Sequence, residues 1–313
     1  IYGGLKAVVI ADTINGVGLI IGGLMIPVFG LMALGEGSFG AGLDTLLYAA
    51  PEKLQSVGTE TDPLPFSTLF TGLLLVNLYY WGTDQSIIQR ALGAKNLKEG
   101  QKGVILAGAI KVISPLFLII PGIIAFHMFG ADAGNPDTMY TRLVNEVLPK
   151  PLVGFFVAVM FGAILSTFNG VLNSSTTLFA LNVYKPLFGQ GKTDEELVGK
   201  GRIFGVVIAI ISVCIAPFIM YAPEGLFQYL QMVAGFFSVP IFTIVFVGYV
   251  SKRVPAVAAK VALVVFVSSY AAMQLVFKTP IHFLHQLAIL FVVCTALMSC
   301  LLYTSPSPRD SFR

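Results

Sequence analysis

A stripe of polar side chains runs through one of the most apolar stretches of the chain. Ser166, Asn169, Asn173 and Thr177 are spaced by three, four and four residues in "AILSTFNGVLNSSTTLF", so they share one face of a helix. Their oxygens, with the carbonyl of Ala163, are hard ligands that suit a sodium ion. Ser and Thr also bond back to their own helix and allow close helix packing. The stripe therefore indicates either a sodium site or a tight helix contact.

Polar or charged side chains lie in three other apolar stretches. Asp12 follows Lys6 by six residues, and is either a helix-end carboxylate in interfacial water or a group that handles a cation. Lys111 either reaches the interface through its long stem or points into the bundle. Phe227 and Gln231 share a helical face at i and i+4, either in a helix-cap region near the outer surface or in a ligand site.

The segment Val76–Arg90, "VNLYYWGTDQSIIQR", gathers amides, aromatic rings and a carboxylate within one apolar stretch. Tyr80 and Trp81 fit an interfacial aromatic belt, but Asn77 lies deeper in the same stretch. Gly82 beside these side chains favours the alternative, a helix that is locally unwound around a ligand.

The composition places these residues in a membrane protein. Of 313 residues 56% are hydrophobic and 11% are charged, whereas soluble domains carry about 25% charged residues. The net charge of +3 gives no indication of a nucleic-acid partner. The apolar runs are continuous and too long for barrel strands, so we predict an all-α integral membrane protein in the lipid bilayer. Eight stretches are long enough to span it: Ala7–Leu34, Phe66–Gln89, Gly103–Phe129, Leu152–Tyr184, Ile203–Tyr221, Leu226–Val250, Ala256–Phe277 and Phe283–Leu302.

Lys and Arg predict the orientation. The segments 90–102, 184–202 and 251–260 carry eleven of them, and the alternate segments 35–64, 130–150, 222–225 and 278–282 carry four. Basic loops face the cytoplasm, which predicts a multi-pass protein of the inner (plasma) membrane. Segment Thr138–Leu148 is expected to form a short helix on the outer face.

Three segments carry a family resemblance: "GGLKAVVIADTIN", "NLYYWGTDQSIIQRALGAKNLKEGQKG" and "GAILSTFNGVLNSSTTLFALNVYKPLF". They resemble the sodium:solute symporter family, and within it the bacterial sodium/galactose and sodium/glucose cotransporter branch. The resemblance extends to about Leu302. It implies a leucine-transporter-type fold of inverted helix repeats and sodium-coupled import of a sugar or sugar-like neutral solute by alternating access, and therefore no enzyme. On this basis we expect residues 1–302 to be the C-terminal part of the symporter domain, without its first four core helices, and 303–313 to be a non-native or disordered tail.

The resemblance also implies residue roles. The carbonyl of Ala163 and the hydroxyls of Ser166 and Thr167 match the sodium site, and Asp12 matches the acidic residue beside it. The residues that match solute contacts are Asn77, Lys111 and Gln231 as polar partners, Tyr80 and Phe227 as rings on the inner and outer sides, and Trp81 as a supporting ring. Rings beside amides and an ammonium suit a hexose, which has an apolar C–H face and a rim of hydroxyls.

Some family members bind a second sodium ion through hydroxyls three and four residues after the position that matches Ser166. This chain differs from them at both positions. Here those residues are Asn169 and Gly170, so we expect one sodium ion per solute. Two alternatives remain open. One is a transporter-like sensor fused to a signalling domain; the other is a sodium symporter of inositol, an amino acid, a vitamin or sialate.

Overall fold

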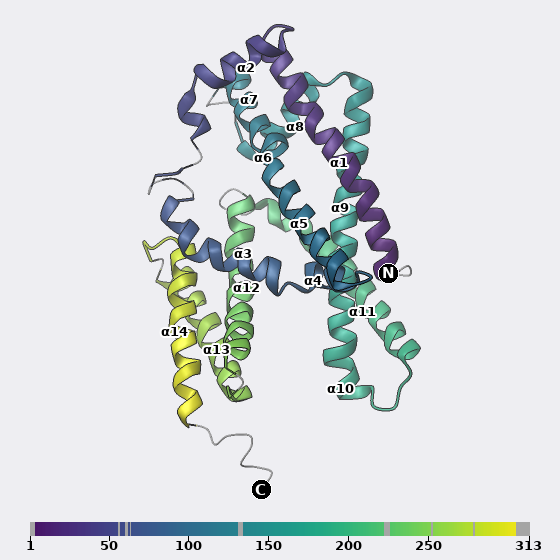
Figure 1. Ribbon diagram of the computed structural model, residues 1–313, viewed down its shortest axis with the longest axis vertical. Coiled ribbons are helices and arrows are strands. Elements are labelled where there is room, and N and C mark those ends of the chain that lie inside the picture. Colours follow the sequence, from purple (N-terminus) through teal and green to yellow (C-terminus); the bar gives the residue numbers. More distant parts are fainter. Residues whose placement is uncertain are drawn as a thin grey trace. The chain divides into compact units, whose positions relative to one another are not determined.

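The computed structural model describes residues 4–55, 57–59, 62, 64–130, 134–221, 226–251, 253–277 and 279–304 (Figure 1). Most of the tail expected at 303–313 therefore lies outside the described residues. Every element in the described part is a helix or a helical turn. The chain divides into two compact units, one of residues 1–55 with 89–221 and one of residues 56–88 with 222–313.

The first unit is built around two long helices, α1 (Gly4–Leu34) and α9 (Lys150–Leu178), which pack side by side (Figure 1). A Cβ at Gly18 would lie 3.2 Å from a Val159 methyl, and one at Gly162 would lie 2.6 Å from Oδ1 of Asn15. Small residues let helices approach this closely in a membrane. The unit also contains α2 (Phe39–Tyr48), α4 (Gln85–Leu92) from Gln89 onward, α5 (Leu97–Ile113), α6 (Pro115–Leu118), α7 (Ile120–Phe129), α8 (Pro136–Val147), α10 (Lys185–Phe188) and α11 (Asp194–Ile215).

Helix α8 confirms the short helix expected at Thr138–Leu148. Its Leu143 is fully buried in an apolar cluster with Ile26 of α1. Its Tyr140 hydroxyl donates to the carbonyl of Phe117 at 3.1 Å. Burial raises the pKa of Tyr140 to about 12, so the hydroxyl keeps the proton that it donates. This packing fixes α8 against the ends of the longer helices.

A proline bends the span that contains Lys111. Helix α5 and the segment Pro115–Phe129 meet at an angle of 41°. Pro115 has no N–H to donate to the carbonyl of Lys111, four residues earlier. The hydroxyl of Ser114 donates to that carbonyl instead, at 2.7 Å. The bend therefore lies beside Lys111.

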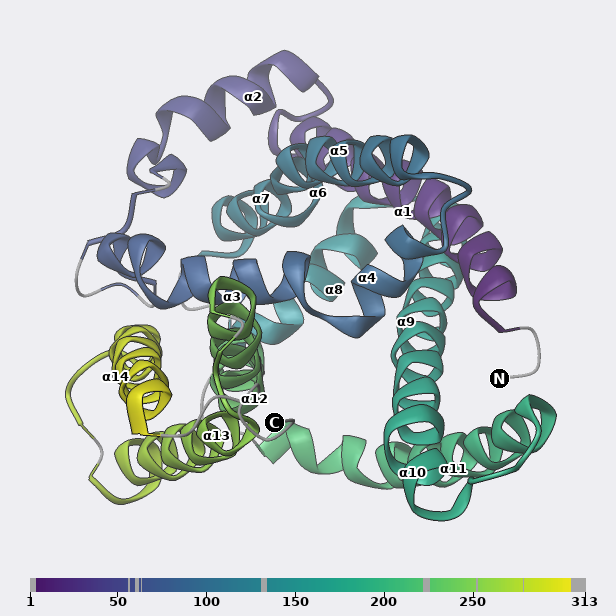
Figure 2. The ribbon, with the colours of Figure 1, turned by 60° about the horizontal axis from the view of Figure 1, so that its bottom comes forward.

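The second unit contains α3 (Gly72–Gly82), α12 (Leu226–Val250), α13 (Ala256–Ala271) and α14 (Phe283–Thr304), and Figure 2 shows α12, α13 and α14 gathered together. Phe266, Tyr270 and Leu287 are fully buried between them. Helix α3 packs against α12 and α14. At its start, a Cβ on Gly72 would collide with the backbone oxygen of Leu284.

A histidine of α14 binds the segment that leads into α3. His285 on α14 makes hydrogen bonds through both ring nitrogens, at 2.9 Å to the hydroxyl of Thr71 and at 3.2 Å to that of Ser67. The beginning of α3 is thus held on α14 by both side-chain hydrogen bonds and close backbone contact.

The number of long helices differs from the sequence expectation. By length and composition, the described residues contain six apolar helices that could cross a membrane, or seven if the bent pair is one span. The remaining stretch, Phe66–Gln89, consists of a 3₁₀ turn at Phe66–Phe70, then α3, and then the beginning of α4. It is helical, but it is not one helix.

The break between α3 and α4 has a local cause. The N–H groups of Thr83 and Asp84 both donate to the carbonyl of Tyr79, at 2.8 and 3.0 Å, which ends α3. A carboxylate oxygen of Asp84 then accepts from the N–H of Ser86 at 2.8 Å, which caps the beginning of α4. The break in the helix that was expected beside Gly82 is confirmed, and a ligand at this break stays a prediction.

The contact at Gly72 predicts a stability effect. We expect Gly72→Ala to destabilise the protein by about 1–3 kcal/mol, because backbone atoms of α14 must move to admit the methyl group. Thermal unfolding of the purified full-length protein in detergent measures this. Gly248→Ala is the control, since a Cβ at Gly248 of α12 meets nothing within 4 Å. Equal melting temperatures for the two variants would contradict the packing argument.

Candidate functional site

Asp12 of α1 is the centre of a polar cluster inside the first unit. Its Oδ1 accepts a hydrogen bond from the hydroxyl of Ser166 on α9. Its Oδ2 is paired with Arg90 of α4, at 2.9 Å to Nη2 and 3.0 Å to Nε. The side chains of Asp12 and Arg90 are 25% and 28% exposed. Both carboxylate oxygens are therefore engaged, and three helices meet at one charge.

Gly170 makes room for the guanidinium group of Arg90. A Cβ at this position would collide with Nη2. From the sequence, Gly170 is notable only because it offers no hydroxyl ligand. In the structure, the arginine occupies the space that a side chain at position 170 would need.

Arg90 was absent from the candidate residues, although a signal for it exists. A carboxylate inside a membrane bundle nearly always has a partner, and Arg90 closes the same motif that supplied Asn77 and Tyr80. The need of Asp12 for a cationic partner is the signal that points to Arg90.

Two amide side chains strengthen the contact of α9 with its neighbours. Asn15 of α1 donates to the carbonyl of Gly162 at 3.0 Å. Gln89, beside Arg90 on α4, donates to the hydroxyl of Ser174 at 3.1 Å, and that hydroxyl donates to the carbonyl of Gly170 at 2.9 Å. These bonds hold α1 and α4 against α9, so that Asp12 stays in contact with both Arg90 and Ser166.

The polar stripe of α9 divides into two parts with different partners. Ser166 reaches Asp12 on another helix, as a site residue would. Thr177 donates to the carbonyl of Asn173 on its own helix at 2.8 Å, as in the packing interpretation. The side chains of Thr167 and Asn169 are exposed, and Ala163 is half-buried. Of the residues expected to bind sodium, the structure brings Ser166 and Asp12 together. The role of all four, Ala163 and Thr167 included, in sodium binding stays a prediction.

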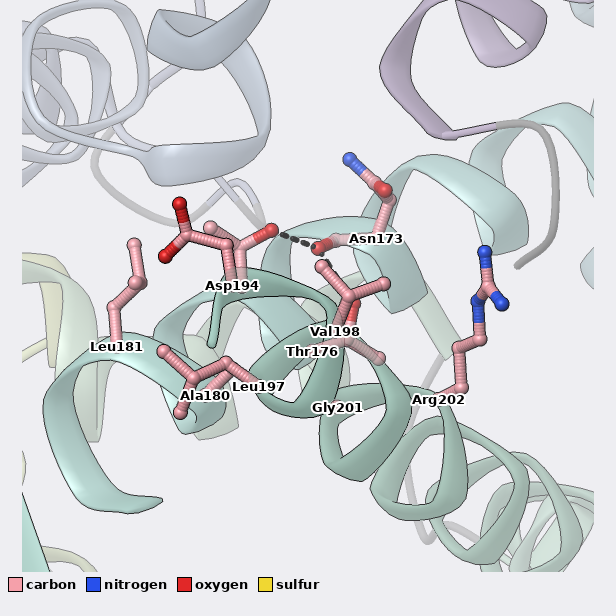
Figure 3. A pocket seen from close by; sticks show the side chains of 10 residues that line it. Asn173, Thr176, Ala180, Leu181, Asp194, Leu197, Val198, Gly201 and Arg202 are labelled. Carbon is pink, nitrogen blue, oxygen red and sulfur yellow. Dashed lines mark hydrogen bonds between the residues drawn. The ribbon is translucent and has the colours of Figure 1, made fainter. Parts of the chain in front are cut away.

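A cavity of about 440 Å³ lies where the second part of the stripe faces α11 (Figure 3). Along α9 it begins about 10 Å from Ser166, at 1.5 Å per residue. Asp194 and Arg202 stand on opposite sides of it in Figure 3. It is lined by Asn173, Thr176, Thr177, Ala180, Leu181, Asp194, Leu197, Val198, Gly201 and Arg202.

The expected solute contacts on α3 lie within two turns. The Tyr80 and Trp81 rings are 42% and 37% exposed and meet edge to face, with centroids 5.4 Å apart. The amide of Asn77 donates to the carbonyl of Leu73 at 2.9 Å and is exposed. The carbonyl oxygen of this amide is thus the group that could accept from a solute hydroxyl.

The other expected solute contacts are distributed over the chain. Gln231 is half-buried on α12, in the same unit as α3. The side chain of Phe227, also on α12, lies outside the described residues. Lys111 is exposed on α5 and belongs to the first unit. A common solute site for these residues stays a prediction.

Long apolar helices, a broken helix and an internal charge cluster are typical of membrane transporters. The chain belongs to the sodium:solute symporter family, whose model matches residues 1–266. It is therefore a multi-pass membrane protein of a transporter family. Within the described residues, no group of three or more His, Cys, Asp or Glu could hold a metal ion.

Two relatives illustrate the range of similarity. Over 306 residues the chain is 48% identical to the uncharacterized symporter YidK of Escherichia coli strain K12. The matched region covers 98% of this chain and 53% of YidK. It is 33% identical to the sodium/glucose cotransporter of Vibrio parahaemolyticus, over 84% of this chain and 52% of the relative. The chain spans about half the length of the curated relatives that it matches.

A solved structure shows the same fold. A sodium-coupled sialic acid symporter, in its substrate-bound outward-open state, matches with a TM-score of 0.82 over 97% of this chain and 64% of that chain. The identity is 18%, so the likeness concerns the fold. The expectation of an all-α symporter fold is confirmed.

The contact between Ser166 and Asp12 leads to a prediction about sodium. We expect Ser166→Ala and Thr167→Ala each to raise the sodium concentration for half-maximal uptake by the full-length protein. Loss of one oxygen ligand should cost on the order of 1–3 kcal/mol, or about 5- to 150-fold. Ser175→Ala, on the same helix, is the control. Unchanged sodium dependence in both variants would remove these residues from the sodium site.

Proposed function

We propose that the chain is part of a sodium-coupled symporter that imports a neutral sugar or sugar-like solute by alternating access. The observation that supports sodium coupling most directly is the meeting of Ser166 and Asp12 between α1 and α9. A hydroxyl that donates to a carboxylate keeps its lone pairs for a cation, and the negative charge beside it favours cation binding. The membership of the sodium:solute symporter family supports the same proposal.

The proposal of a sugar rests on chemistry and on relatives. The exposed rings of Tyr80 and Trp81 beside Asn77 on α3 offer an apolar face and an amide to the same solute. The relatives include the sodium/glucose cotransporter of Vibrio parahaemolyticus, and also the human sodium/myo-inositol cotransporter at 28% identity over 81% of this chain. Both names describe neutral polyhydroxylated solutes, so myo-inositol is the second candidate.

Uptake by proteoliposomes that contain the full-length protein tests the proposal. The panel is radiolabelled galactose, glucose, myo-inositol, sialic acid and proline, with an inward sodium gradient. We expect accumulation of a neutral polyol and its loss when choline replaces sodium. Accumulation of sialic acid or proline alone would contradict the solute class, and uptake that is indifferent to sodium would contradict the coupling.

Lys111 is proposed to donate to solute hydroxyls. Lys111→Ala should raise the KM of uptake about tenfold or more, the effect of losing a hydrogen bond to a charged group. The amount of protein in the membrane should stay unchanged. Lys102→Ala is the matched control, since Lys102 lies on the same helix and pairs with Glu99 at 2.8 Å. Equal KM values for the two variants would assign Lys111 to the lipid–water interface.

We propose a stoichiometry of one sodium ion per solute, because Asn169 and Gly170 offer no hydroxyl. One ion that crosses 100 mV supplies about 2.3 kcal/mol, and a tenfold sodium gradient adds about 1.4 kcal/mol. Together these concentrate a neutral solute about 500-fold, so a second ion is not required for accumulation. Reversal potentials of the reconstituted full-length protein should give one charge per solute. A ratio of two would refute the single-ion proposal.

A further inference from the structure

Asp12 is paired with one cation, Arg90, and lies where the proposed sodium ion would bind. Asp12 carries a single negative charge, and Arg90 makes two hydrogen bonds to its Oδ2. A sodium ion bound through Ser166 would lie against the same carboxylate, because the Ser166 hydroxyl donates to Oδ1. Two cations beside one carboxylate repel each other in a medium of low dielectric. Arginine and sodium are therefore alternatives at Asp12.

The arginine is placed so that it can move. Its side chain is 28% exposed, and its terminal group lies against the bare backbone of Gly170. The backbone of α4 is held separately, because the neighbouring Gln89 donates to Ser174 on α9. A movement of the guanidinium group away from Asp12 would therefore not require α4 to move.

We propose that Arg90 is a tethered cation that competes with sodium for Asp12. When sodium binds, the guanidinium group moves away; when sodium leaves, it returns and neutralises the carboxylate. An unpaired carboxylate in the membrane interior is costly, so the arginine allows the carrier to return without its ion. This inference rests on the proposed sodium coupling, and it gives Arg90 a role in releasing the ion.

Sodium affinity distinguishes competition from a purely structural ion pair. Binding of ²²Na⁺ to the purified full-length protein should become about fivefold tighter or more in Arg90→Gln, because sodium no longer displaces a charge. Arg90→Lys keeps the charge but loses the two-point contact with Oδ2, so its sodium affinity should lie between those of wild type and Arg90→Gln. Lys102→Gln, which removes a cation from an exposed ion pair on α5, should have no effect.

A second variant tests the same competition from another helix. Gly170→Ala leaves every charge in place and is favourable for helix formation, but its methyl group displaces Nη2 of Arg90 from its position. Sodium binding should again become tighter. Saturable sodium binding in wild type that neither variant tightens would overturn the inference alone. Absence of saturable sodium binding in wild type would instead refute the proposed coupling and the inference with it.

Discussion

The first unit depends on the charge of Asp12. A carboxylate among apolar helices is costly unless it is paired and hydrogen-bonded. Here Ser166 and Arg90 engage both of its oxygens, and each comes from a different helix. The requirement to satisfy one charge therefore fixes α1, α4 and α9 against one another. It also places a guanidinium group and a hydroxyl against the same carboxylate.

Glycines decide how closely these groups approach. Gly162 admits Asn15, and Gly170 admits the guanidinium group of Arg90. Larger side chains at either position would separate the helices or move the polar groups apart. In the second unit Gly72 has the same role toward the backbone of α14. In a bilayer, where apolar surface is not driven together by water, such close packing and hydrogen bonding hold helices in place.

Much of the fold could be predicted because lipid imposes a length on apolar helices. The short helix α8 and the unwinding beside Gly82 also followed from the sequence. The site was only partly predictable. A stripe at helical spacing is the same whether a hydroxyl reaches another helix, as Ser166 does, or its own carbonyl, as Thr177 does. The pairing of Asp12 with Arg90 joins residues 78 positions apart, and no local periodicity contains it.

The break between α3 and α4 explains why the sequence alone places Arg90 in the basic cytoplasmic segment 90–102. If Phe66–Gln89 were one helix, Arg90 would follow its last turn and face water. Because Thr83 and Asp84 end α3 and cap a new helix, the direction of Arg90 is set by α4 and by Gln89 beside it. Gly170 then has two linked consequences: it removes a hydroxyl that could bind a second ion, and it admits a cation that belongs to the protein. The proposed single-ion stoichiometry and the neutralisation of Asp12 therefore both depend on Gly170.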